Sequence, residues 1–159
     1  MIILIFGQPS SGKTTLAQLL KTHLYERYCF DDIHNVDGDV VRTMFNNKDF
    51  SREGRLKNLK TISDISLYIN RAKYDFTIIS AVYPYLESRE YLKVNCEKWD
   101  VPFLSVYLTY DKPRERENYH VKDFEMPSRS EEIIHLNTDL LSDWECVEII
   151  ANGIVHKRK

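Results

Sequence analysis

The chain has 159 residues, of which 22 are Lys or Arg and 24 are Asp or Glu, so its formal net charge is -2. This length predicts a single domain over residues 1–159, and 43% hydrophobic residues are enough to form its core. The balanced charge argues against a protein that coats a nucleic acid polymer or a membrane surface. The apolar run 1–6 is too short for a signal peptide or a membrane span, so we expect a cytoplasmic protein with reduced cysteines.

Short runs typical of β-strands alternate with longer helical stretches along the chain. We predict strands over 2–6, 33–37, 76–81, 103–108 and 133–136. We predict helices over 14–28, from a cap at Ser51, over 85–99, and from a capping box of Ser142 with Glu145 to a stop at Gly153. This alternation indicates an α/β fold in which helices sandwich a parallel sheet of about five strands, with ligands at the carboxyl ends of the strands.

Residues 7–14 fit the phosphate-binding pattern G-x-x-x-x-G-K-(S/T), the P-loop, between an apolar strand and an amphipathic helix. Gly7 and Gly12 allow the backbone to wrap phosphate oxygens, and Lys13 supplies a positive charge to the β- and γ-phosphates. The Thr14 hydroxyl is the expected Mg²⁺ ligand. We therefore predict an ATP site formed by Gly7, Gln8, Ser10, Ser11, Gly12, Lys13, Thr14 and Thr15.

Two carboxylates, Asp37 and Asp39, follow the second predicted strand, whereas the third ends without one. On an extended strand end, residues two apart point the same way, so both carboxylates are predicted to face one site. We assign Asp37 to the metal and Asp39 to the proton of an attacking hydroxyl, although the two roles could be exchanged. A P-loop with an Asp-x-Asp pair and no Asn-Lys-x-Asp run favours a small-molecule kinase over a GTPase.

Two further segments carry a resemblance to a known family. Residues 37–42 (DGDVVR) and 50–58 (FSREGRLKN) resemble the adenylylsulfate (APS) kinase patterns D-G-D-N-x-R and G-F-S-x-x-D-R-x-x-N, and residues 82–85 with Arg89 resemble the family's I-S-P-Y segment. The resemblance implies transfer of the γ-phosphate of ATP, with Mg²⁺, to the 3′-hydroxyl of adenylylsulfate. It also implies that Phe50 stacks on the base of this small nucleotide acceptor. The other acceptor contacts that we predict are Asp39, Arg42, Arg55, Asn58 and Tyr83.

The chain departs from the family pattern at several positions. Tyr83 stands where the family has Ser, and Gly54 stands where it has Asp. The family's lid is shortened, and we expect Arg114 or Arg116 to reach the γ-phosphate, with a solvated charge run as the alternative. The acceptor stays open between adenylylsulfate and a relative such as cytidine diphosphoramidate. A gluconate- or shikimate-type kinase and a non-catalytic nucleotide-binding regulator are the competing functions, and a homodimer is compatible with the sequence.

Overall fold

The computed structural model describes residues 1–72, 75–112, 119–128 and 131–157. Its strands are β1 (Ile2–Phe6), β2 (Ile33–Asp37), β3 (Phe76–Ser80), β4 (Phe103–Thr109) and β5 (Ile133–Asn137). Its helices are α1 (Lys13–Tyr28), α2 (Gly38–Met44), α3 (Arg52–Arg71), α4 (Leu86–Lys98) and α5 (Asp143–Lys157). None of the helices in these ranges is long and apolar enough to cross a membrane.

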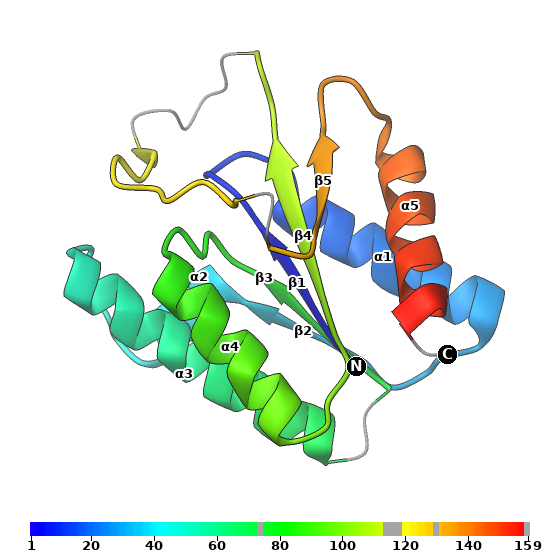
Figure 1. Ribbon diagram of the computed structural model, residues 1–159, viewed down its shortest axis with the longest axis horizontal. Coiled ribbons are helices and arrows are strands. Elements are labelled where there is room, and N and C mark those ends of the chain that lie inside the picture. Colours follow the sequence, from blue (N-terminus) through cyan, green and yellow to red (C-terminus); the bar gives the residue numbers. More distant parts are fainter. Residues whose placement is uncertain (73–74, 113–118, 129–130, 158–159) are drawn as a thin grey trace.

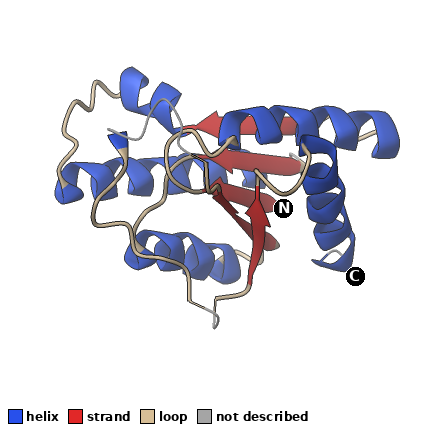
Figure 2. Ribbon diagram, turned by 90° about the horizontal axis from the view of Figure 1, so that it is seen from above, coloured by secondary structure: helices blue, strands red, loops and turns tan. Residues whose placement is uncertain are grey.

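The five strands form one parallel sheet in the order β2-β3-β1-β4-β5. β1 lies at its centre and is buried along its whole length, as its continuous apolar sequence predicts for a strand covered on both faces. Helices lie on both sides of the sheet (Figure 2). The predicted α/β class, with a helix-sandwiched parallel sheet, is confirmed.

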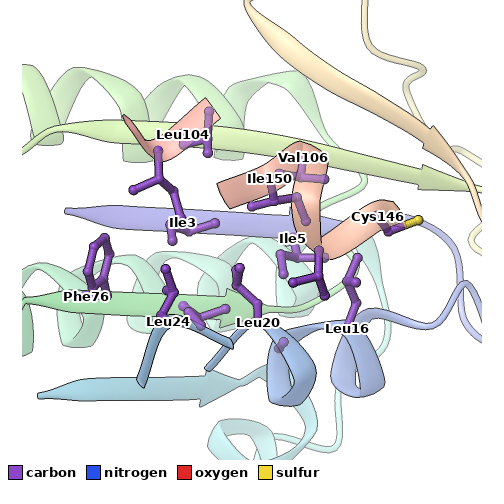
Figure 3. Packing of buried hydrophobic residues seen from close by; sticks show 14 of the residues in the cluster. Ile3, Ile5, Leu16, Leu20, Leu24, Phe76, Leu104, Val106, Cys146 and Ile150 are labelled. Carbon is purple, nitrogen blue, oxygen red and sulfur yellow. The ribbon is translucent and has the colours of Figure 1, made fainter. Parts of the chain in front are cut away.

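Alternate side chains of β1 pack into two separate hydrophobic cores, one on each face of the sheet. Ile3 and Ile5 pack with residues of α1 and α5 on one face, as Figure 3 shows. Ile2, Leu4 and Phe6 point to the other face, where α2, α3 and α4 cover the sheet (Figure 1). The sheet is thereby fixed from both sides, and the loops at the carboxyl ends of its strands are held in place above it.

Apart from one-residue differences at the ends of several elements, the structure departs from the sequence prediction at α2 and at the end of α5. The helix α2 was not predicted; it begins directly after β2, because the Asp37 side chain caps it by accepting the backbone N–H groups of Asp39 and Val40. The predicted stop at Gly153 is wrong, since α5 continues to Lys157. A Cβ on Gly153 would lie 2.8 Å from Ile134 Cδ1, so this glycine allows close packing against β5. The Ser142–Glu145 capping box is present, with reciprocal backbone hydrogen bonds.

Candidate active site

The P-loop connects the central strand β1 to the N-terminus of α1. Gly12 has a φ of 89° and Gly7 a φ of 150°, and a Cβ on Gly7 would lie 2.3 Å from the carbonyl oxygen of Leu108. Both positions therefore require glycine. Lys13 Nζ donates to the Gln8 carbonyl at 2.7 Å and to Ser11 Oγ at 3.4 Å, which holds the ammonium across the loop. The loop and the positive end of α1 together form an anion site.

The outer side of the P-loop is tied to distant parts of the chain. Gln8 Nε2 donates to the Val121 carbonyl, and Val121 N–H donates to Gln8 Oε1, both at 3.0 Å. The hydroxyl of Tyr110 donates to the Pro9 carbonyl at 2.9 Å. The Gln8 side chain is thus occupied by the backbone of Val121. Only the backbone of Gln8 remains to contact a phosphate.

Asp37 is fixed at the junction of β2, β3 and the P-loop. In the sheet register it lies opposite Ser80, and its Oδ2 accepts from Ser80 Oγ and from Thr14 Oγ1, each at 3.1 Å. Its Oδ1 caps α2. A hydroxyl and a carboxylate oxygen in contact are the hard ligands that Mg²⁺ takes, so Thr14 and Asp37 fit this ion. Ser80 was not predicted as a site residue, although a hydroxyl at the end of the third predicted strand was an available signal.

Asp39 was predicted to lie on an extended strand end, and this prediction is wrong because α2 begins at Gly38. Asp37 is the cap of this helix and Asp39 lies in its first turn, exposed beside the same cavity. A Cβ on Gly38 would lie 2.7 Å from the Cβ of Ala81, so the helix begins in close contact with the segment after β3. The two carboxylates therefore differ: one is held by four donors, and the other is open to solvent.

A cavity of about 750 Å³ joins the P-loop to residues of α2, α3 and the loop between them. It is large enough for small-molecule ligands. Most of the residues predicted for both substrates line it: Ser10, Gly12, Lys13, Thr14, Thr15, Asp37, Asp39, Arg42, Phe50, Arg55 and Asn58. Tyr119, which the sequence analysis did not single out, also lines it.

Phe50 lines this cavity beside two arginines. Its side chain is 62% exposed, so it is not a core residue. The Cζ atoms of Arg42 and Arg55 lie 4.5 and 5.5 Å from its ring centroid. Burial, and then the positive charge of Arg55, lower the pKa of Arg42. The two positively charged guanidinium groups repel one another, so an anionic ligand between them would be favoured. The exposed aromatic ring beside them suits a flat ligand.

Tyr83 is not a substrate contact in this structure, contrary to the prediction. It is 0% exposed, and its hydroxyl hydrogen-bonds Ser63 Oγ at 2.9 Å and the Leu59 carbonyl at 3.2 Å. Burial raises its pKa above the usual range. A tyrosine ring at this position turns into the core under α3, while its neighbours Val82 and Pro84 line the cavity.

Three further arginines were singled out from the sequence. Arg114 and Arg116 lie outside the described residues. Arg89, which the resemblance singled out, is buried; it pairs with Glu131 at 3.0 Å and donates to the Tyr83 carbonyl at 3.2 Å. Its guanidinium thus links α4 to the segment before β5 and has a structural role.

Comparison with known proteins places this site in a family. A family model described as adenylylsulphate kinase matches residues 1–138. A probable adenylyl-sulfate kinase of Aeropyrum pernix is 33% identical over 109 residues, which cover 68% of this chain and 58% of that protein. An adenylyl-sulfate kinase of Myxococcus xanthus is 30% identical over 109 residues, which cover 67% of this chain and 56% of that protein. The matches thus span little more than half the length of these relatives.

Solved structures share the fold. The APS kinase of Mycobacterium tuberculosis in complex with AMPPNP and APS has a TM-score of 0.78 at 19% identity, and the match covers 95% of each chain. A hexameric APS kinase from Thiobacillus denitrificans has a TM-score of 0.74 at 23% identity, with 98% of this chain and 28% of that chain covered. The structural likeness shows the P-loop kinase fold. Since the family model matches most of the sequence, the chain belongs to the adenylylsulphate kinase family.

Proposed function

We propose that this protein is an ATP-dependent kinase that transfers the γ-phosphate to the ribose 3′-hydroxyl of a small nucleotide related to adenylylsulfate. One observation carries the proposal: a single cavity joins the P-loop and Asp37 to Phe50 and its two flanking arginines. A donor phosphate and an acceptor base would then lie in one cavity, as in-line transfer requires.

On the donor side, the P-loop N–H groups and Lys13 would hold the phosphates. Lys13 now donates to the Gln8 carbonyl, so it needs only a side-chain rotation to exchange this partner for a phosphate oxygen. Thr14 and Asp37 would hold Mg²⁺, which, when bound, neutralises charge on the β- and γ-phosphates. Ser80 keeps the Asp37 carboxylate turned toward Thr14.

On the acceptor side, Phe50 would stack on the base, and Arg42 and Arg55 would bind the anionic groups. Asp39 is our assignment for the group that accepts the proton of the attacking hydroxyl. Its exposed carboxylate lines the cavity, whereas both Asp37 oxygens already accept hydrogen bonds. The cytoplasmic location stays a prediction, and a homodimer stays compatible with the sequence.

The test is a coupled ADP-release assay of the purified protein with ATP and Mg²⁺. The acceptors to compare are adenylylsulfate, cytidine diphosphoramidate, gluconate and shikimate. We expect turnover with a nucleotide acceptor only. Turnover with a sugar acid alone would replace the proposal with a sugar-acid kinase, and ATP binding with no turnover of any acceptor would favour a regulator.

A further inference from the structure

Gly54, in the first turn of α3, is in close contact with the side chain of Asp49. A Cβ built on Gly54 would lie 2.3 Å from Asp49 Cγ and 2.5 Å from Asp49 Oδ2. Side-chain carbons do not approach this closely without a shift of one partner. The carboxyl group of Asp49 therefore fills the space that any larger residue at position 54 would need.

Asp49 is itself held by the loop that leads into α3. Its Oδ1 accepts the Ser51 N–H at 2.8 Å, and its own N–H donates to Asn47 Oδ1 at 3.0 Å. Asn47 Nδ2 in turn donates to the Gly54 carbonyl at 3.0 Å. Hydrogen bonds from the side chain and then the backbone of Ser51 lower the pKa of Asp49, so its carboxyl group is ionised at neutral pH. The loop and the first turn of α3 form one hydrogen-bonded unit.

This unit carries the acceptor-side groups. The Asp49 carbonyl accepts from Arg42 Nη1 at 2.8 Å, and the Phe50 carbonyl accepts from Arg55 Nε at 2.9 Å. Phe50 is largely exposed, so core packing does not fix its ring. The position of the ring therefore depends on the backbone between Asp49 and Ser51. That backbone depends in turn on the contact between the Asp49 side chain and Gly54.

We propose that Asp49, seated against Gly54, is a positioning residue that sets Phe50 and Arg42 for the acceptor. The proposal rests on the proposed function, because it concerns the acceptor half of that site. A purely structural role for this contact makes a different prediction: the clash in Gly54→Ala would then lower the melting temperature and leave the acceptor KM unchanged.

The experiment measures Gly54→Ala in two backgrounds, the natural chain and Asp49→Gly. In the natural chain, Gly54→Ala displaces the Asp49 carboxyl group, and we expect the acceptor KM to rise about tenfold, the scale of one lost well-placed contact. The KM for ATP stays unchanged. Asp49→Gly alone gives a similar rise, and adding Gly54→Ala to it raises the melting temperature without a further rise in acceptor KM. Asp49→Asn keeps an oxygen acceptor for Ser51 and retains a KM within about twofold of the natural chain.

Two results would overturn the proposal: an unchanged acceptor KM in Gly54→Ala, or the same rise from Gly54→Ala in both backgrounds. If Gly54→Ala does not fold, the double variant still supplies the comparison with Asp49→Gly. Calorimetric titration of each variant with adenylylsulfate and with cytidine diphosphoramidate, in the presence of ADP, separates this proposal from the proposed function. A natural chain that binds one of these nucleotides but does not turn it over refutes the kinase assignment alone, whereas one that binds neither refutes both.

Discussion

Replacing Phe50 with alanine should weaken acceptor binding and leave the fold intact. The ring is 62% exposed and lies 4.5 Å from the Arg42 guanidinium carbon, so it contributes little to the core. Stacking of a base on an aromatic side chain is worth about 1–3 kcal/mol, which corresponds to a rise in acceptor KM of about 5- to 150-fold. The ring makes two exposed cation–π contacts, with Arg42 and Arg55, worth about 0.5–1 kcal/mol each, so the melting temperature should fall by no more than about 8 °C.

The assay is ADP release with adenylylsulfate varied at saturating ATP, and then with ATP varied at saturating acceptor. The KM for ATP should stay constant, because the P-loop does not depend on this ring. Tyr83→Phe is the matched control: it removes a buried hydroxyl bonded to Ser63 and should cost about 1 kcal/mol of stability with no change in either KM. An unchanged acceptor KM in Phe50→Ala, together with a large loss of stability, would refute the stacking role and favour a sugar-acid acceptor.

Three other predictions concern Lys13, the two aspartates Asp37 and Asp39, and the ion pair between α4 and the segment before β5. Lys13→Ala should abolish turnover at an unchanged melting temperature, since its charge serves the transferred phosphate; near-normal turnover would contradict this. Asp39→Asn should lower kcat by about 100-fold or more, whereas the defect of Asp37→Asn should be relieved by raised Mg²⁺; equal, mild losses would refute the assignment. Burial opposes ionisation of Glu131, but hydrogen bonds from Arg89 and a backbone N–H outweigh it and lower the Glu131 pKa. Glu131→Gln should therefore cost about 2 kcal/mol at pH 7, and this difference should shrink as the pH falls below about 4.3 and through the lowered folded-state pKa; a pH-independent difference in urea unfolding would contradict it.

The sheet could be predicted from the sequence because short strand-like runs alternate with longer helical stretches, and β1 is a continuous apolar run that ends at Gly7. β1 and β2 were predicted with the bounds that the structure shows. α2 could not be predicted in the same way, since its seven residues, Gly38–Met44, include a glycine and two β-branched valines, which are poor helix formers. The Asp37 cap and the contact with Ala81 decide its formation, and the second of these depends on the tertiary fold.

The acceptor half of the site shows a second limit of sequence reasoning. Phe50, Arg42 and Arg55 were predicted together from the resemblance to the adenylylsulfate kinase family, and the structure brings them together. In the sequence, Gly54 was noted only as a position where the family has Asp. In three dimensions the carboxyl group of Asp49 lies beside it, across the start of α3, and a linear comparison does not reveal that contact.

The central place of β1 has a consequence for how this chain folds. Ile2 of β1 pairs with Thr77 of β3 and with Phe103 of β4. The ribosome therefore synthesises both strand partners of β1 long after β1 itself. At roughly 5–20 residues per second, β3 leaves the ribosome several seconds after β1. During that interval the five apolar residues of β1 have neither their strand partners nor the complete helix layers that later cover them. Closing this long loop should limit the folding rate, and β1 is exposed to wrong pairing during that interval.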